Sequence, residues 1–201
     1  MKILITGIHG FVGSNIVEYL KKDNEIYGLD IVAPEKDGVV KTFSWEDLDA
    51  GNISEIDAII HLAGKAHDTK NKSAAEIYFK VNTGLTQKIF DYFMTSGAKK
   101  FVFFSTAKAA ADRVEGVLTE DIVPSPVGPY GESKIKAEEY ILSNELPVDK
   151  QVYIFRPCMI HGPGNKGNLN LLYNVVRKGI PWPLGAFENR RTFTSIENIC
   201  F

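Results

Sequence analysis

KILITGIHGFVG, residues 2–13, is the stretch that decides the fold of this chain. Its first five residues are an apolar run typical of a β-strand, and the rest is a glycine-rich turn. A helical pattern follows, and then a second strand that ends on Asp30. A strand, a glycine turn, a helix, a strand and an acid within about 30 residues are typical of a dinucleotide-binding unit. Asp30 would accept hydrogen bonds from the hydroxyls of an adenosine ribose.

The three glycines of the turn have separate physical roles. Gly7 permits a tight turn with positive φ, Gly10 has no side chain to keep a pyrophosphate from the backbone, and Gly13 lets the helix pack closely on the strand. The helix that begins near Phe11 and Val12 offers N–H groups and a positive dipole end to phosphates. The alternative is a glycine turn that binds no ligand.

The composition indicates an ordinary globular protein. The chain has 201 residues, 44% of them hydrophobic, and a formal net charge of −2. This charge does not steer a protein toward nucleic acid or membranes, and no apolar run approaches the ~20 residues of a membrane span. Cys158 and Cys200 do not have the spacing of metal ligands. We therefore expect no metal site. Met1 leads directly into a strand, so we expect no signal peptide. The small number of cysteines suits a reducing cytosol, and we expect a soluble, cytoplasmic protein.

Strand and helix patterns alternate along the rest of the sequence. Short apolar runs predict further strands at 39–43, 57–64, 99–106, 152–157 and 192–196. Apolar residues at three- and four-residue steps predict helices at 73–95, 130–142 and about 169–178. A loop is expected at 107–128, and a glycine-rich loop follows Pro157.

This alternation predicts an α/β, doubly wound Rossmann fold with a mostly parallel sheet and helices on both faces. Ligands bind such sheets at the carboxyl ends of the strands. Asp30, Ala63-Gly64, Ser105-Thr106 and the segment after Pro157 all follow predicted strands. The sequence therefore predicts one site at one edge of the sheet.

Tyr130 and Lys134 stand four residues apart, so a helix would place them on one face. A nearby lysine ammonium and an oxidised nicotinamide ring would both favour the phenolate and lower the pKa of Tyr130 from its ordinary ~10. Such a phenol can move a proton to and from a sugar hydroxyl during hydride transfer. Taken alone, the pair is equally a surface lysine beside a packed tyrosine.

Together these motifs resemble the extended short-chain dehydrogenase/reductase superfamily, in its NAD-dependent nucleotide-sugar epimerase/dehydratase branch, and UDP-glucose 4-epimerases in particular. TGIHGFVG at 6–13 resembles the family's glycine turn, and HLAG at 61–64 its strand end. Asn82 resembles the asparagine of its fourth helix, and the segment from Arg156 to Gly164 its R-P-x-x-x-Y-G-P-G motif. The resemblance runs along essentially the whole chain.

The resemblance implies roles for individual residues. Tyr130 would be the catalytic acid/base with Lys134 as its partner, and Thr106 would bind the reacting oxygen. Ser105 is the less favoured hydroxyl, because successive strand residues face opposite ways. The residues implied in cofactor binding are Gly7, Gly10, Phe11, Val12, Gly13, Asp30, Leu62, Ala63, Gly64, Asn82, Lys134 and Pro157. Asn168 and Arg191 resemble positions that hold the sugar-nucleotide diphosphate, although Arg191 is alternatively a solvated surface residue.

The sequence also departs from the family pattern. Family dehydratases carry an Asp-Glu pair after the catalytic threonine, and this chain has Ala107-Lys108, so dehydration is not expected. His161 replaces a usual tyrosine. The family's C-terminal portion normally extends about 100 residues further, so we expect a truncated chain. Its predicted domains are an NAD-binding Rossmann domain at 1–160 and an incomplete substrate-binding region at 161–201.

These features lead to one expected function and two alternatives. We expect an NAD-dependent nucleotide-sugar epimerase that acts at C4 of a UDP-hexose or UDP-N-acetylhexosamine through a 4-keto intermediate. Asp30 favours NAD, because its charge would repel a 2′-phosphate. The alternatives are an NAD(P)H-dependent 4-ketoreductase or dehydrogenase, and a non-catalytic dinucleotide-sensing protein. The resemblance further implies a homodimer through the helices at 73–95 and 130–142.

Overall fold

The computed structural model describes residues 1–53, 55–65, 74–165, 168–181 and 190–201. The chain divides into two units, Met1–Pro157 and Cys158–Phe201. The first unit contains a six-stranded sheet and the second a two-stranded sheet.

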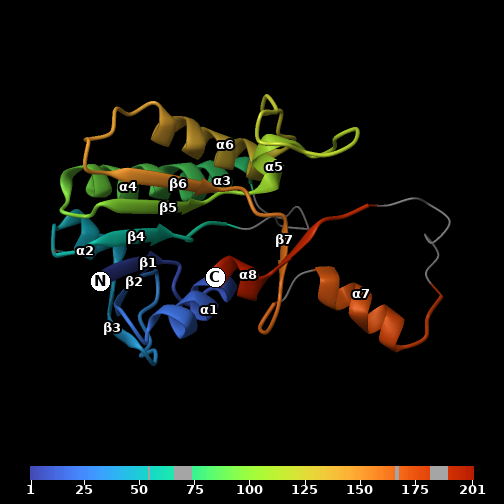
Figure 1. Cartoon of the computed structure of the whole chain (residues 1–201), viewed down its shortest axis with the longest axis horizontal. Coiled ribbons are helices and arrows are strands. Elements are labelled where there is room, and N and C mark those ends of the chain that lie inside the picture. Colours follow the sequence, from blue (N-terminus) through green and yellow to red (C-terminus); the bar gives the residue numbers. More distant parts are fainter. Residues whose placement is uncertain (54, 66–73, 166–167, 182–189) are drawn as a thin grey trace. The chain divides into compact units, whose positions relative to one another are not determined.

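Six strands form the sheet of the first unit (Figure 1). They are β1 (Lys2–Thr6), β2 (Glu25–Leu29), β3 (Val39–Phe43), β4 (Ala58–His61), β5 (Lys100–Phe104) and β6 (Gln151–Phe155). Their order is β3-β2-β1-β4-β5-β6, and every neighbouring pair is parallel. This order confirms the predicted doubly wound sheet.

The helices of the first unit connect these strands. They are α1 (Phe11–Leu20), α2 (Trp45–Asp49), α3 (Ala75–Tyr78), the π-helix η1 (Phe79–Gly84), α4 (Leu85–Thr95), α5 (Ala107–Ala110) and α6 (Pro129–Leu142). The connection through α1 runs from β1 to β2, whereas the connection through α4 runs from β4 to β5, in the opposite direction across the sheet. Since parallel crossovers share one hand, α1 covers one face and α4 and α6 cover the other, as predicted (Figure 1).

The core of the first unit lies between the sheet and helices α4 and α6. Phe90 and Phe93 of α4 are fully buried and both pack on Phe101 of β5, with ring centroids 5.3 Å apart in each pair. Phe101 and Phe103 point to the same face because strand residues alternate. This packing fixes β5 against the helices, and the end of β5 carries the predicted hydroxyl pair.

Helices α2 and α5 and strand β7 (Met159–His161) are short elements that were not predicted from the sequence. Helix α2 begins with a capping box, in which the Ser44 hydroxyl accepts from the Asp47 N–H and the Asp47 carboxylate accepts from the Ser44 N–H. Helix α5 lies within the predicted loop at 107–128, and β7 (Met159–His161) lies in the predicted glycine-rich segment. Elements of three to five residues are too short to show a hydrophobic period.

The helix predicted at 73–95 consists of α3, η1 and α4 in succession. Its predicted first residue, Ser73, lies outside the described residues. The central π-helix was not predicted, because its wider turn leaves no distinct sequence pattern. Asn82 lies within it and is fully buried. Single π-helical turns frequently occur at functional sites.

The second unit contains a small parallel sheet. Its elements are β7 (Met159–His161), α7 (Asn168–Arg177), β8 (Phe193–Ser195) and α8 (Ile196–Cys200). Strands β7 and β8 pair from Met159 with Phe193 to His161 with Ser195. The hydroxyl of Ser195 caps α8 by accepting from the Asn198 N–H at 3.1 Å. The predicted helix at 169–178 and strand at 192–196 are thus found with shifted ends.

Lys150 closes the C-terminal end of helix α4. Its ammonium is buried at 8% exposure and donates to the carbonyl oxygens of Phe93, Ser96 and Ala98 at 2.8, 2.8 and 2.6 Å. The last carbonyls of a helix lack partners within the helix and carry a negative dipole end. Lys150 satisfies both requirements and joins α4 to the start of β6.

We expect Lys150→Met to lower the free energy of unfolding by about 3 kcal/mol, because buried carbonyls lose a charged donor. Lys99→Met is the matched control: Lys99 is exposed and pairs with Asp149 at the surface, so its loss should cost at most about 1 kcal/mol. Urea unfolding followed by circular dichroism measures both. Equal losses in the two variants would contradict the role given to Lys150.

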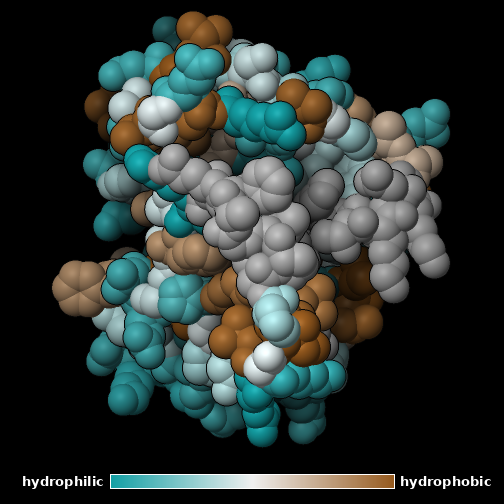
Figure 2. Space-filling model, turned by 90° about the vertical axis from the view of Figure 1, so that its right-hand side faces the viewer, coloured by the Kyte–Doolittle hydropathy of each residue, from teal (hydrophilic) through white to brown (hydrophobic). Residues whose placement is uncertain are grey.

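Figure 2 shows hydrophilic and hydrophobic residues interspersed on one face of the molecule. Exposed apolar side chains such as Val117, Val123 and Val127 occur in the segment that joins α5 to α6. Scattered apolar residues are normal on a protein surface. None of the helices in the described parts of the chain combines the length and apolar character needed to cross a membrane.

Candidate active site

The glycine turn lies at the carboxyl end of β1, at the edge where all the parallel strands of the first unit end. Gly7 has φ +68°, and a Cβ on it would lie 2.9 Å from the backbone N and Cα of Ala63. A Cβ on Gly13 would lie 2.5 Å from the carbonyl oxygen of Gly7. Both positions therefore require glycine. The N-cap of α1 is Gly10, which has no side chain to occupy the helix N-terminus.

Asp30 lies directly after β2 and faces the glycine turn. Its carboxylate accepts from the backbone N–H of His9 at 3.2 Å and of Ile31 at 2.8 Å. The residue remains partly exposed. An acceptor held beside a glycine turn and a helix N-terminus is the arrangement that a ribose and a pyrophosphate need. The residues present therefore fit a dinucleotide.

A buried histidine connects the neighbouring strand to the helix layer. His61 is fully buried, with Nδ1 2.6 Å from Thr6 Oγ1 and Nε2 2.9 Å from Thr86 Oγ1. Thr86 donates its only hydroxyl proton to the carbonyl of Asn82, so His61 must donate from Nε2 and accept at Nδ1. Burial holds the pKa of His61 well below its usual value, with a smaller contribution from the positive charge of Lys134. The imidazole is therefore neutral.

This chain of hydrogen bonds also shapes the segment after β4. Thr6 donates to His61, and its oxygen accepts from the N–H groups of Leu62 and Ala63 at 3.1 and 2.9 Å. Residues 62–64 are thereby held beside the glycine turn. The predicted cofactor-binding segments at 7–13 and 62–64 are thus brought together.

Asn82 of the π-helix joins this segment to α6. Its side chain accepts from the Lys65 N–H at 2.7 Å and donates to the Ser133 hydroxyl at 2.9 Å. Ser133 in turn donates to the carbonyl of Tyr130. A Cβ on Gly64 would lie 3.0 Å from Asn82 Oδ1 and 3.4 Å from Lys134 Nζ. Asn82 is therefore a structural connection in this network as well as a predicted cofactor contact.

Thr106, Tyr130 and Lys134 meet at the ends of β5 and α6. Helix α6 begins at Pro129 after Gly128, which has φ +84°. The side chains of Tyr130 and Lys134 lie on one face of its first turns. Tyr130 makes a side-chain hydrogen bond with Thr106. Lys134 Nζ donates to the carbonyl of Phe104 at 2.8 Å. The structure thus brings the three predicted catalytic residues together.

Without a cofactor the pKa of Tyr130 is raised and not lowered, so the lowering expected from Lys134 by itself is wrong, and the lowering expected from the nicotinamide ring stays a prediction. Burial raises the pKa of Tyr130 above its ordinary value, the hydrogen bond with Thr106 opposes the shift, and Tyr78 adds to it. Burial likewise lowers the pKa of Lys134 to about 8, against the raising effect of the Glu138 carboxylate. The phenol is therefore neutral at pH 7 unless another positive charge reaches it.

The structure also distinguishes the two hydroxyls after β5. Ser105 is buried and its hydroxyl donates to Glu138, whereas Thr106 faces Tyr130. Glu138 is 1% exposed and receives Arg156 through both carboxylate oxygens, with Nη2 to Oε2 at 2.6 Å. Ser105 is consequently used within the protein, as strand alternation predicted. Glu138 was missed, although it continues the four-residue spacing of Tyr130 and Lys134.

Comparison with known proteins is consistent with this site. The model of the NAD dependent epimerase/dehydratase family matches residues 3–200. The chain belongs to this family. A UDP-glucose 4-epimerase of Vibrio cholerae is 34% identical over 213 residues, which cover 98% of this chain and 63% of that protein. The N-acetyl-alpha-D-glucosaminyl-diphospho-ditrans,octacis-undecaprenol 4-epimerase of Escherichia coli O157:H7 is 27% identical, with 98% and 60% covered.

The chain therefore spans about three fifths of the length of these epimerase/dehydratase relatives. A solved UDP-N-acetylglucosamine 4-epimerase of Methanobrevibacter ruminantium M1, in complex with UDP-N-acetylmuramic acid, matches 99% of this chain with a TM-score of 0.81. The two sequences are 22% identical, and the match covers 70% of the solved epimerase. The dTDP-glucose 4,6-dehydratase of Streptomyces venezuelae, with NAD bound, is 24% identical with a TM-score of 0.81 over all of this chain and 70% of that chain. These likenesses confirm the fold.

The remaining predicted residues lie further along the chain. The carbonyl of Pro157 accepts from the Ala107 N–H at 3.0 Å, so it lies at the end of the first unit beside α5. Asn168 begins α7 and Arg191 is exposed, both in the second unit. Their contacts with a diphosphate stay predictions for this member of the epimerase/dehydratase family.

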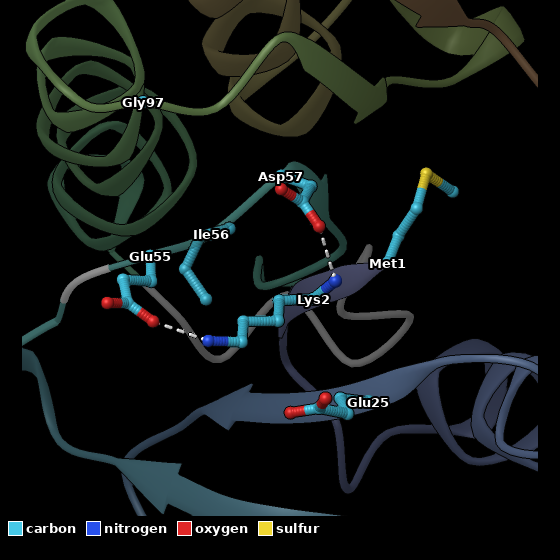
Figure 3. Close-up of a pocket in the computed structure, with 7 residues that line it drawn as sticks. All are labelled: Met1, Lys2, Glu25, Glu55, Ile56, Asp57 and Gly97. Atoms are coloured by element: carbon cyan, nitrogen blue, oxygen red, sulfur yellow. Dashed lines mark hydrogen bonds and ion pairs between the residues drawn. The ribbon is translucent and has the colours of Figure 1, made fainter.

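A separate hollow of about 470 Å³ lies at the opposite edge of the sheet, at the amino ends of β1 and β2 (Figure 3). Lys2 and Glu55 form an ion pair across it, and the Asp57 carboxylate accepts from the Lys2 N–H at 2.7 Å. Ligands of parallel α/β sheets bind at the carboxyl edge. We therefore interpret this hollow as a gap between the amino ends of the strands and not as a ligand site.

Proposed function

We propose that the protein is an NAD-dependent nucleotide-sugar epimerase that inverts C4 of a UDP-hexose or UDP-N-acetylhexosamine. The observation that carries this proposal is the meeting of Thr106, Tyr130 and Lys134 at the sheet edge that also holds the glycine turn and Asp30. The relatives in Vibrio cholerae and Escherichia coli are 4-epimerases by name, which supports the choice of reaction.

The geometry of the site supports the cofactor-binding residues that the resemblance implies. The glycine turn and the N-terminus of α1 would hold the pyrophosphate, Asp30 the adenosine ribose, and residues 62–64 with Asn82 and Lys134 the nicotinamide half. We propose that Pro157 lies near the carboxamide of the nicotinamide. We also propose that Asn168 and Arg191 bind the diphosphate of the sugar nucleotide. Bound NAD would supply the hydride acceptor and a positive charge near the phenol.

Tyr130 would move the proton of the 4-hydroxyl. A positive charge brought near its phenol would offset the effect of burial on its pKa, so that the phenolate forms when the site is filled. Thr106, which already bonds Tyr130, would bind the same sugar oxygen and orient it. The ammonium of Lys134 would stabilise the phenolate. Loss of the hydroxyl proton to Tyr130 and of the C4 hydride to the bound cofactor would give a 4-keto sugar, which would present its other face before the hydride and the proton return.

The segment after Thr106 supports epimerisation over dehydration. Ala107 and Lys108 begin α5, and Lys108 pairs with Asp112 at 2.8 Å. No carboxylic acid directly follows Thr106 to protonate a leaving hydroxyl. Relatives named as a GDP-6-deoxy-D-mannose reductase and a GDP-6-deoxy-D-talose 4-dehydrogenase, at 26% and 25% identity, keep a ketoreductase or dehydrogenase as the second candidate.

Two experiments test the proposal. Heat denaturation of the purified protein should release NAD into the supernatant, and recovery of NADP alone would contradict it. NMR of a UDP-sugar mixture incubated with the protein should show a C4 epimer without consumption of cofactor. Net oxidation of NAD(P)H with a 4-keto sugar, and no epimer, would instead identify a ketoreductase. Cofactor binding without any turnover by the full-length protein would favour a dinucleotide sensor.

We also propose that the protein is a cytoplasmic homodimer that pairs α4 and α6. These helices lie side by side on one face of the sheet (Figure 1). The free thiols of Cys158 and Cys200 suit a reducing compartment. Light scattering after size-exclusion chromatography should give twice the mass of the chain.

Asp30 should determine the choice between NAD and NADP. We expect Asp30→Asn to strengthen NADP binding relative to NAD by about tenfold to a hundredfold, because like-charge repulsion costs a few kcal/mol. The amide keeps an acceptor for the His9 N–H. Isothermal titration with each cofactor measures the ratio, and Asp23→Asn, at an exposed site after α1, is the control. An unchanged ratio in Asp30→Asn would contradict this role.

A further inference from the structure

Glu138 is a buried carboxylate whose purpose the proposed reaction does not explain. It lies on α6 one turn after Lys134 and is 1% exposed. Burying a carboxylate is costly unless it is paired and hydrogen-bonded. Glu138 has two partners, the hydroxyl of Ser105 after β5 and the guanidinium of Arg156 after β6. One side chain therefore links the ends of two strands to the catalytic helix.

The link to Ser105 determines where Thr106 lies. The backbone on either side of Thr106 is bound as well, because Ser105 N–H donates to the Phe155 carbonyl at 2.7 Å and Ala107 N–H to the Pro157 carbonyl at 3.0 Å. These bonds set the path of the backbone. The bond between Ser105 and Glu138 then fixes that segment against α6, on which Tyr130 lies.

The link to Arg156 orients the carboxylate. Arg156 donates from Nε to both oxygens of Glu138, at 3.1 and 3.0 Å, and from Nη2 to Oε2 at 2.6 Å. A guanidinium that binds both oxygens leaves a carboxylate little rotational freedom. Arg156 is followed directly by Pro157, the last residue of the first unit. The cluster of Ser105, Glu138 and Arg156 thus joins three elements at the site edge.

We propose that Glu138 is a positioning residue that holds Thr106 and Lys134 in register with Tyr130 through its bonds to Ser105 and Arg156. This inference rests on the proposed function for its effect on turnover, but its structural content does not. Without the carboxylate, the strand ends and α6 would keep their fold while Thr106 and Lys134 lose their fixed placement.

The charges around Lys134 give a readout that a purely structural residue would not move. Among the described residues, the titratable groups near Lys134 are Tyr130 and Glu138 on α6 and the neutral His61 of β4; Arg156 lies against Glu138. The Phe104 carbonyl and the Phe103 ring complete its surroundings. Among these described groups, the Glu138 carboxylate is the one that supplies a negative charge. Its removal should move the deprotonation of Lys134 to lower pH.

The principal test is Glu138→Gln, with Glu139→Gln as matched control. Glu139 is the next residue of α6 and is exposed. We expect kcat of Glu138→Gln to fall about tenfold to a hundredfold, the scale of a small misplacement of catalytic groups, with KM for the sugar nearly unchanged. The Cε resonance of Lys134 in ¹³C-lysine-labelled protein, assigned by its loss in Lys134→Met, should titrate at lower pH than in wild type. Glu139→Gln should change neither.

A second variant should shift the Lys134 titration in the opposite direction. Arg156→Met removes the positive charge beside Glu138, so the Lys134 resonance should titrate at higher pH while kcat again falls. Ser105→Ala removes only the bond to the β5 end and keeps the ion pair, so kcat should fall with little change in the titration. Opposite shifts in Glu138→Gln and Arg156→Met cannot follow from general loss of stability.

The titration uses the protein without cofactor or substrate, so it stands even if no epimerase activity is found. Absence of turnover in the full-length wild-type protein would overturn the proposed function, while the Lys134 shifts would still test the cluster. A Glu138→Gln protein with wild-type kcat and an unshifted Lys134 resonance, altered only in its melting temperature, would overturn the positioning role.

Discussion

Replacing Tyr130 with phenylalanine should lower kcat about a thousandfold, within the range that general acid–base catalysis contributes. The substitution removes one hydroxyl from a half-buried site and keeps the ring, which packs edge-on against Tyr78 with centroids 6.3 Å apart. The Ser133 hydroxyl bonds the backbone of residue 130 and is not disturbed. The fold and the bound cofactor should therefore persist while proton transfer is lost.

The measurement is the rate of C4 epimer formation by NMR, beside the nucleotide released on heating. Tyr140→Phe is the matched control: it lies on the same helix, its hydroxyl donates to Asp91 at 2.6 Å away from the site, and it should keep activity within about twofold. Retention of more than a tenth of the wild-type kcat in Tyr130→Phe would show that another group moves the proton.

Gly13→Ala should weaken cofactor binding and destabilise the protein. The added Cβ would lie 2.5 Å from the Gly7 carbonyl oxygen and 2.9 Å from Ile8 Cα, both backbone atoms that no side-chain rotation can move. Overpacking of this kind costs about 3 kcal/mol in the free energy of unfolding. Because the displaced atoms are those of the phosphate turn, NAD affinity should fall by about a hundredfold, equivalent to about 2.7 kcal/mol.

Gly97→Ala is the control, since a Cβ at Gly97 would meet no described atom within 4 Å. Isothermal titration with NAD and urea unfolding measure the two effects. A Gly13→Ala protein with wild-type stability and affinity would contradict the close packing of α1 on the turn. A Gly13→Ala protein that loses NAD affinity but keeps wild-type stability would show that the added methyl group disturbs the NAD complex and not the free protein.

Local patterns in the sequence predicted most of the fold and many of the site residues. Apolar runs, glycines and three- and four-residue steps are local signals. They located the glycine turn, Asp30, the alternating strands and helices of a doubly wound fold, and the face shared by Tyr130 and Lys134. The resemblance to the family favoured Thr106, and the alternation of strand residues indicated that only one of the two hydroxyls, Thr106 or Ser105, reaches the site. These features follow from backbone geometry over a few residues, which the order of side chains determines directly.

Only the tertiary structure decided how burial and distant partners act on those residues. The pKa of Tyr130 is raised because the surrounding fold removes water from the phenol, and the π-helix around Asn82 has no distinct local pattern. The bonds of Glu138 to Ser105 and Arg156 join residues 33 and 18 positions away. Such contacts depend on the path of the whole chain. The sequence by itself therefore determined which groups reach the site edge, and the packing of β5, β6 and α6 decided how they are held.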